Sequence, residues 1–222
     1  MDKIQLAQYL DLANHKQNAT PQEIKILCEN VKKFGFHTAF VNPCYVPMVK
    51  DILFETKIAV GTVISFPLGQ DTQDVKTVAA IQAVRAGADE LDVCMNVGWF
   101  KEKMYKEVQQ EMNAVVDAAK GVRDKTIVKI IIETGWLGAD EIRKASQMVI
   151  DSGADFVKTC SGMGPRGAKI EDVCIIAGVV GDKCKIKVAG GIETLAQALE
   201  FIEAGASRIG TSHAVDIISQ MK

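Results

Sequence analysis

The sequence predicts a (β/α)8 TIM barrel, and three observations lead to this prediction. Eight short apolar runs alternate with segments of helical periodicity. The segments 83–93, 148–160 and 201–212 repeat one pattern, in which a helical stretch ends at a glycine and an apolar run follows. No glycine-rich dinucleotide or phosphate loop follows an early strand, as an open doubly wound sheet would require. A chain of 222 residues with this alternation fits one compact barrel domain, residues 1–222.

Four strands are predicted in the first half of the chain, and each is a short apolar run, at 9–14, 37–42, 58–66 and 89–96. The helix between the first two strands is expected to begin at Thr20, because threonine is a favourable N-cap and Pro21 suits the first helical position. Gly87 suits the left-handed end of a helix, and the run after it suits a buried parallel strand.

The second half of the chain predicts four more strands, at 127–133, 155–160, 185–189 and 207–211. Gly153 and Gly205 repeat the role of Gly87, since each closes a helical stretch just before an apolar run. Helix, glycine and strand therefore recur in the same order along the whole chain, as expected for a repeated βα unit.

Composition points to a small-molecule partner. The formal net charge is −2, and 26 basic and 28 acidic residues are interspersed, so no patch suited to nucleic acid or an anionic membrane is evident. The N-terminal segment lacks the apolar core of a signal peptide, and no stretch is long enough to span a bilayer, so a cytoplasmic protein is expected. Six cysteines without CxxC spacing are expected to be reduced thiols.

Strand parity sorts the polar side chains, because alternate residues of a barrel strand point into the barrel or out toward the helices. The apolar residues at 91, 93 and 95 form one face of their strand, so Asp92 is expected to point inward. The same alternation places Lys129, Lys158 and Lys187 inside the barrel. Three lysines and an aspartate should therefore converge there. For Asp11, parity does not decide between the bottom and the top of the first strand.

Several lysines that point into one barrel indicate a catalytic role for these residues more than a structural one. A single one is compatible with a structural ion pair. Three ammonium groups beside fewer carboxylates are disfavoured by desolvation and mutual repulsion, so at least one lysine should have a lowered pKa. A neutral lysine attacks carbonyl carbons, and Schiff-base catalysis also requires a carboxylate that moves protons. The pattern therefore favours lysine-dependent carbonyl chemistry.

Two glycine-bearing loops are candidates for binding an anion. The segment 189–193 follows the seventh strand at the start of a helix, and 210–213 follows the eighth strand at the start of the last helix. Barrels commonly bind phosphate at these two loops, where backbone N–H groups and helix N-termini face the anion. Simple turn geometry is the alternative for each glycine alone, but both loops together predict a phosphosugar ligand.

The residues of six segments resemble the deoxyribose-phosphate aldolases, in order and over nearly the whole chain: 41–47, 62–72, 87–98, 129–137, 153–162 and 187–192. The resemblance implies a metal-free and cofactor-free class I aldolase on a TIM barrel. Its substrates would be small phosphosugars and aldehydes, with 2-deoxy-D-ribose 5-phosphate cleaved reversibly to acetaldehyde and D-glyceraldehyde 3-phosphate.

The resemblance also implies roles for individual residues. Lys158 would form the Schiff base, Lys187 would be the second ammonium that disfavours its charged form, and Asp92 would relay protons with a bound water. The phosphate would be held by a set of small loop residues, Gly190, Gly191, Gly210 and Ser212.

Departures from the family pattern lie near the substrate. They are Leu12 and Ala13 after the first-strand aspartate, Cys160 on strand six, Arg166 in the following loop, and His213 after strand eight. Substrate preference is therefore less constrained than reaction type. Because Cys160 lies two residues from Lys158 on the same strand face, alkylation of its thiol is expected to block activity.

Other functions stay open at this stage. A related lysine aldolase with a different phosphosugar, a phosphosugar isomerase or epimerase that shuttles protons without a covalent adduct, and a silent phosphate-binding barrel would share these features. The three histidines show no HxH or HExxH spacing, so no metal site is expected. Glu133 would either pair with Lys129 or border the pocket. A homo-oligomer, dimer or tetramer, is compatible with a barrel of this size.

Overall fold

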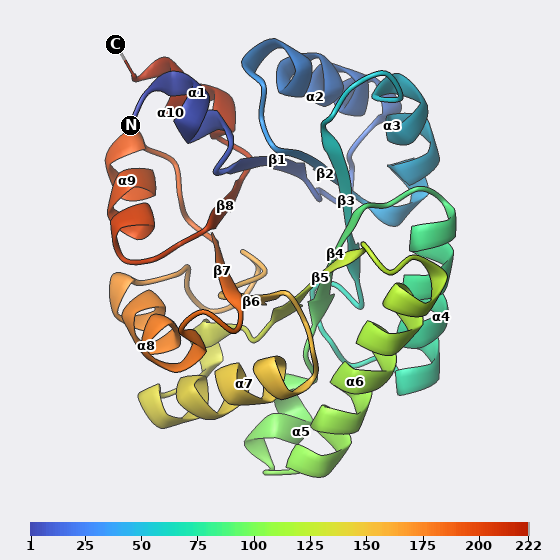
Figure 1. Cartoon of the computed structure of the whole chain (residues 1–222), viewed down its shortest axis with the longest axis vertical. Coiled ribbons are helices and arrows are strands. Elements are labelled where there is room, and N and C mark those ends of the chain that lie inside the picture. Colours follow the sequence, from blue (N-terminus) through green and yellow to red (C-terminus); the bar gives the residue numbers. More distant parts are fainter. Residues whose placement is uncertain (222) are drawn as a thin grey trace.

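The computed structural model describes residues 1–221 and confirms the predicted fold class. Its parallel strands close into a barrel in sequence order, with β8 pairing β1 (Figure 1). The strands are β1 Leu10–Asn14, β2 Thr38–Val41, β3 Ala59–Ile64, β4 Glu90–Cys94, β5 Ile127–Ile131, β6 Phe156–Lys158, β7 Lys185–Ala189 and β8 Arg208–Thr211. Each lies within the run predicted for it.

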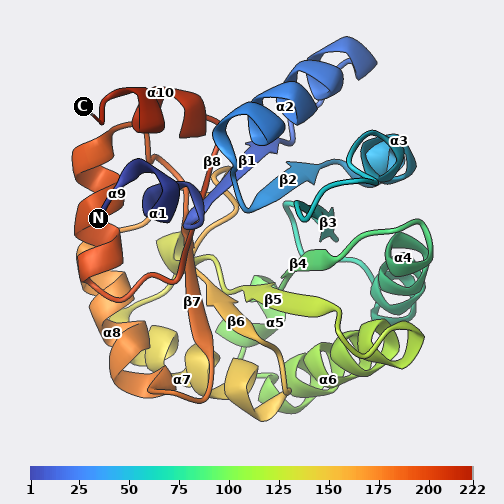
Figure 2. The same ribbon diagram turned by 45° about the horizontal axis from the view of Figure 1, so that its top comes forward.

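Helices surround the barrel and cover the outer faces of its strands (Figures 1 and 2). A short helix, α1, precedes β1, and the helix order is α1 Lys3–Ala7, α2 Pro21–Phe34, α3 Val46–Ile52, α4 Gln73–Arg85, α5 Val97–Lys101, α6 Tyr105–Val122, α7 Ala139–Asp151, α8 Ile170–Val180, α9 Leu195–Glu203 and α10 Ala214–Ser219. Two 3-10 turns, Pro43–Tyr45 and Thr134–Trp136, follow β2 and β5.

Helix boundaries follow capping chemistry. The Thr20 side chain accepts a hydrogen bond from the backbone of Glu23, whose carboxylate accepts one from the Thr20 backbone, and Pro21 occupies the first helical position. This reciprocal arrangement satisfies two N–H groups that the helix itself leaves unpaired. The expected start of the second helix is thereby confirmed. Gly87, Gly153 and Gly205 all have positive φ, as their predicted place at helix ends requires.

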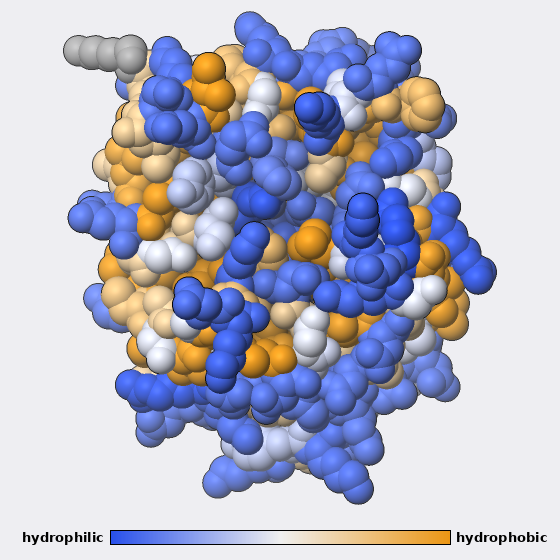
Figure 3. Space-filling model, in the orientation of Figure 1, coloured by the Kyte–Doolittle hydropathy of each residue, from blue (hydrophilic) through white to orange (hydrophobic). Residues whose placement is uncertain are grey.

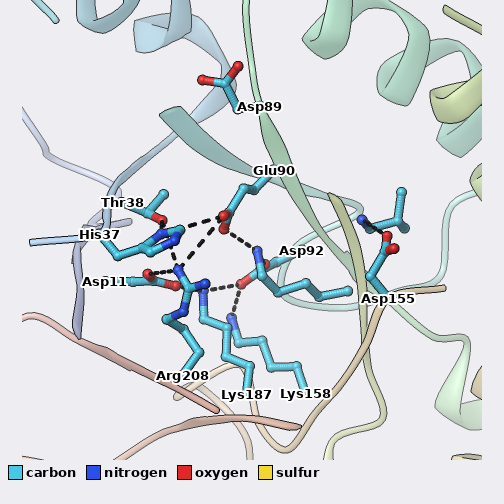
Figure 4. Close-up of polar contacts among 12 residues, drawn as sticks. Asp11, His37, Thr38, Asp89, Glu90, Asp92, Asp155, Lys158, Lys187 and Arg208 are labelled. Carbon is cyan, nitrogen blue, oxygen red and sulfur yellow. Dashed lines mark hydrogen bonds and ion pairs between the residues drawn. The ribbon is translucent and has the colours of Figure 1, made fainter. Parts of the chain in front are cut away.

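The repeated Gly-Ala-Asp sequence has a further role at the amino ends of the strands. Asp89 Oδ2 accepts a hydrogen bond of 3.0 Å from the backbone of Val60, and Asp155 Oδ2 accepts one of 2.8 Å from Val128. Each aspartate thus pairs the N–H of the second residue of a neighbouring strand, which fixes the register there. Both aspartates lie apart from the central ion pairs in Figure 4.

The core lies between the strands and the helices, where apolar residues such as Leu91, Val128 and Val188 are completely buried. Hydrophilic and hydrophobic residues are interspersed on the surface shown in Figure 3. Among residues 1–221, no helix has both the length and the apolar character that crossing a bilayer demands. The six cysteines are free, as expected.

Candidate active site

The predicted convergence of three lysines on Asp92 is confirmed in the barrel interior, and Figure 4 shows Lys158 and Lys187 beside Asp92. Asp92 Oδ2 lies 2.7 Å from Lys158 Nζ and 2.9 Å from Lys187 Nζ, and Asp92 Oδ1 lies 3.1 Å from Lys129 Nζ. The strand register explains this meeting, because Asp92 pairs with Lys129 and Lys158 pairs with Lys187 across neighbouring strands. Two ammonium groups therefore share a single carboxylate oxygen.

Further charges extend this cluster toward the amino ends of the strands. Asp11 points inward and lies 2.8 Å from Lys187 Nζ and 3.1 Å from Arg208. Glu90 lies 2.5 Å from Lys129 Nζ. The interior thus holds four basic side chains and three carboxylates, which agrees with the expected excess of positive charge. Arg208 was missed in the sequence analysis. The alternation along its strand could have found it, because the neighbouring apolar Ile209 faces outward and Arg208 must then face inward.

The cluster displaces the pKa values of its members. Burial alone would raise the pKa of Asp92, but Lys129, Lys158 and Lys187 hold it well below the usual value. Burial lowers the pKa of Lys187, against the opposing attraction of the nearby carboxylates. Burial would also lower the pKa of Lys129, yet Asp92 and Glu90 outweigh it and raise that pKa. The expectation of a lysine with a lowered pKa therefore agrees with the environment of Lys187.

A pocket of about 510 Å³ opens at the carboxyl ends of the strands. Lys158 and Lys187 line it from the inside, and Asp92 lies directly behind them. The four small residues expected to hold phosphate line its wall as well: Gly190, Gly191, Gly210 and Ser212. The structure thus brings all seven predicted site residues to one place.

The glycines after β7 were expected at the start of a helix, but the helix begins later in the chain. Helix α9 begins at Leu195, and its N-cap Thr194 already accepts a hydrogen bond from Gln197. Gly190 and Gly191 therefore lie in the preceding loop and do not form the helix N-terminus. Both have positive φ, 100° and 76°, so this loop adopts a conformation that favours glycine and exposes backbone groups to the pocket.

Gly210 makes room for Lys187. A Cβ at this position would lie 2.9 Å from Lys187 Cε, closer than side-chain carbon atoms approach each other. A larger residue would displace the lysine from Asp11 and Asp92. Gly210 lies within β8 and not in the loop after it, and it shapes the ion cluster as well as the pocket wall.

Arg166, one of the departures, holds the loop between β6 and α8 in place. Its guanidinium donates hydrogen bonds to both carboxylate oxygens of Asp172, at 2.6 and 3.0 Å, and to the backbone oxygens of Thr134 and Gly167. Gly167 packs against Gly190, where an added Cβ would lie 2.5 Å from the Gly190 oxygen. Arg166 thus joins the loops after β5, β6 and β7, a function that its isolated place in the sequence does not reveal.

We expect Arg166→Ala to lower the free energy of unfolding by about 1–3 kcal/mol, because hydrogen bonds to the buried Asp172 are lost. Urea denaturation measures this change. Arg143→Ala is the matched control, since it removes an exposed arginine paired with the exposed Asp140. Equal stability of the two variants would contradict a structural role for the Arg166 contacts.

The structure argues against the expected sensitivity of Cys160 to alkylation. Its side chain is completely buried, its Sγ lies 3.3 Å from Thr134 Oγ1, and burial raises the pKa of the thiol. A protonated and inaccessible thiol reacts poorly with alkylating reagents. Strand parity located the residue on the inward face but gave no information on access.

Glu133 borders a second pocket and does not pair with Lys129. This pocket, of about 380 Å³, lies beside the first and shares Ser161 and Met163 with it. Glu133 Oε2 accepts a hydrogen bond of 3.0 Å from the backbone of Ser161. Neither alternative for this residue is therefore confirmed as stated, because Glu133 lines the neighbouring pocket and not the one that holds Lys158.

Comparison with known proteins agrees with this geometry. The sequence model of the DeoC/LacD family of aldolases matches residues 6–218. The chain belongs to this aldolase family. A family member from Caldicellulosiruptor saccharolyticus, a deoxyribose-phosphate aldolase, is 45% identical over 220 residues, which cover 99% of this chain and 100% of that protein. A deoxyribose-phosphate aldolase from Aciduliprofundum boonei is 44% identical and covers 100% of this chain and 99% of its own.

Solved structures show the same aldolase barrel. A putative deoxyribose-phosphate aldolase from Coccidioides immitis superposes with a TM-score of 0.95 at 36% identity, over 99% of this chain and 87% of that one. A deoxyribose phosphate aldolase from Aeropyrum pernix, described as a tetramer, gives a TM-score of 0.88 at 29% identity, over 98% and 91% of the two chains. The aldolase fold thus extends over essentially the whole chain.

Proposed function

We propose that this member of the aldolase family cleaves 2-deoxy-D-ribose 5-phosphate reversibly to acetaldehyde and D-glyceraldehyde 3-phosphate through a Schiff base. The observation that carries the proposal is the placement of Lys158 and Lys187 against one oxygen of Asp92, inside a pocket walled by two glycine loops. The full-length similarity to curated deoxyribose-phosphate aldolases supports the choice of substrate. In this proposal residues 1–222 form one catalytic domain.

Lys158 is the proposed nucleophile. Its free amine attacks the C1 carbonyl of the open-chain sugar, and loss of water gives an iminium that accepts electrons from the C2–C3 bond. As that bond breaks, the C3 hydroxyl loses its proton and becomes the aldehyde of D-glyceraldehyde 3-phosphate. Protonation of the remaining enamine at C2, followed by addition of water, releases acetaldehyde and restores the amine.

Lys187 and Asp92 control the charge on Lys158 in this proposal. Lys187 shares the Asp92 oxygen with Lys158, so its positive charge disfavours a second ammonium in the same place. Asp92 touches both amines and is the proposed carrier of protons, acting with a bound water. The excess of basic groups in the interior supports these roles, since three carboxylates are too few to neutralise the three ammonium groups and the Arg208 guanidinium together.

The glycine-bearing segments of the pocket wall are the proposed phosphate site. Gly190 and Gly191 line the pocket in a loop with positive φ, and Gly210 and Ser212 line it as well. Backbone amides arranged in this way form concavities that attract anions. A phosphate held there and a carbonyl at Lys158 together place the sugar along the length of the pocket.

Reduction of the Schiff base tests the proposed function. We expect acetaldehyde or 2-deoxy-D-ribose 5-phosphate with sodium borohydride to inactivate the protein and to leave a reduced adduct on Lys158, located by peptide mass spectrometry. The chemical reason is that borohydride reduces an iminium to a stable secondary amine. Turnover of a phosphosugar without an adduct would contradict the proposal and favour an isomerase or epimerase.

The proposal extends to assembly and location. A solved family member is described as a tetramer, which supports a homo-oligomer for this chain, and size-exclusion chromatography with light scattering tests it. A cytoplasmic location and substrates limited to small phosphosugars and aldehydes fit the balanced surface charge.

A further inference from the structure

His15 stands in the wall of the pocket, immediately after β1, between two aromatic rings. Its ring centroid lies 5.9 Å from that of Phe40, at an interplanar angle of 86°, and 5.2 Å from that of Phe66, at 56°. The imidazole therefore fills a position where aromatic neighbours would accommodate a purely apolar side chain.

The same two rings also lie near Lys158 and Lys187. Lys187 Nζ is 3.6 Å from the centroid of Phe40, and Lys158 Nζ is 6.0 Å from the centroid of Phe66. His15, Lys158 and Lys187 also line one pocket. The imidazole therefore borders the same pocket as the proposed nucleophile.

The His15 imidazole is neutral and lacks a full set of partners. Burial, reinforced by the positive charge of Lys158, lowers the pKa of His15 to about 3. Within the described chain, Nε2 is almost completely buried and has no hydrogen-bond partner, although His15 lines the pocket. A neutral imidazole has one donor and one acceptor, and leaving either unpaired in the protein interior is unfavourable. A ligand that supplies the partner would offset this penalty.

The chemistry of the pocket narrows the identity of that partner. An uncharged imidazole suits a hydroxyl better than a phosphate, and the glycine loops already offer backbone amides for the anion. The C3 hydroxyl must lie where its proton can leave during cleavage. The C4 hydroxyl stands between C3 and the phosphate and undergoes no reaction, so it is free to be recognised.

We propose that His15 is a specificity-determining residue that hydrogen-bonds the C4 hydroxyl of the sugar, which is the α-hydroxyl of the acceptor aldehyde in the addition direction. This inference rests on the proposed function. It adds a contact that distinguishes hydroxylated from deoxygenated acceptors. A site built to hydrogen-bond a hydroxyl discriminates against an analogue that lacks it, because its own polar group is then left unpaired.

The test compares two acceptors in the addition of acetaldehyde: D-glyceraldehyde 3-phosphate and 3-oxopropyl phosphate, which lacks the α-hydroxyl. We expect the wild type to favour the hydroxylated acceptor by about 10-fold or more in kcat/KM, the effect of one good hydrogen bond. In His15→Leu this ratio should fall at least about fivefold, and His15→Gln, which retains a donor and an acceptor, should restore part of it.

His37→Leu is the matched control, because it removes an imidazole next to Thr38 at the opposite end of the barrel and should leave the ratio at the wild-type value. If His15→Leu does not fold, His15→Met makes the same comparison. A wild-type ratio near one, or an unchanged ratio in the apolar variant, would overturn the assignment while borohydride trapping on Lys158 still succeeds. Failure of the wild type to form an adduct or turn over would overturn the proposed function, and this inference with it.

Discussion

Lys158→Ala should lower kcat/KM for cleavage of 2-deoxy-D-ribose 5-phosphate by a factor on the order of 10⁴ or more, because no other residue can replace a covalent nucleophile in that position. The proposed reaction needs an iminium as electron acceptor, and alanine offers no amine. A coupled assay that reduces the D-glyceraldehyde 3-phosphate product measures the loss. Peptide mass spectrometry should find the borohydride adduct absent from the variant.

Lys129→Met is the matched control for this prediction. Lys129 also contacts Asp92 and is completely buried, but it does not line the pocket. Its removal perturbs the same charge cluster, yet the adduct on Lys158 should still form. An adduct that shifts to Lys187 in Lys158→Ala, with activity retained, would contradict the assignment of the nucleophile.

Much of this site followed from the alternation of residues along the strands. The period of two along β4 to β7 was sufficient to place Asp92 and three lysines inside the barrel, because a closed barrel leaves only two directions for a side chain. Strand order then brought them together, since Lys158 and Lys187 occupy the same level of adjacent strands. The glycines that end the helices could also be predicted from the sequence, because the left-handed backbone at a helix end favours glycine whatever the rest of the fold.

Other features depend on contacts that no single strand or loop encodes. The hydrogen bonds from Arg166 to Asp172 and to the Thr134 backbone join the loops after β5 and β6 to helix α8, and their geometry arises only when the barrel closes. The burial of Cys160 beneath Thr134 depends on packing of the same loops. His15 lies beyond the regular alternation of β1, so its position against Phe40 and Phe66 required the assembled structure.

Asp92→Asn is expected to lower the free energy of unfolding at pH 7 by about 3–5 kcal/mol, the usual effect of removing one partner from a buried ionic group. Asp92 is completely buried and is the carboxylate that Lys129, Lys158 and Lys187 all approach. In the variant Lys158 faces an amide in place of its carboxylate, while Lys129 keeps Glu90 and Lys187 keeps Asp11, so the low-dielectric interior holds a larger excess of positive charge. Urea denaturation of the wild type and the variant measures the difference, and Asp140→Asn, at an exposed position, should not change stability.

The pH dependence of this difference gives a second test. Because the folded-state pKa of Asp92 lies below its ordinary value of 3.8, the carboxylate stabilises the fold fully above that value and loses its contribution as pH falls through the folded-state pKa. The stability gap between wild type and Asp92→Asn should therefore be constant from about pH 6 to 8 and narrow below about pH 4. A gap that is absent at pH 7, or that widens in acid, would mean that the three lysines do not depend on Asp92 for their charge balance. The shared carboxylate would then be an incidental contact, and the proposed control of Lys158 by its neighbours would fail with it.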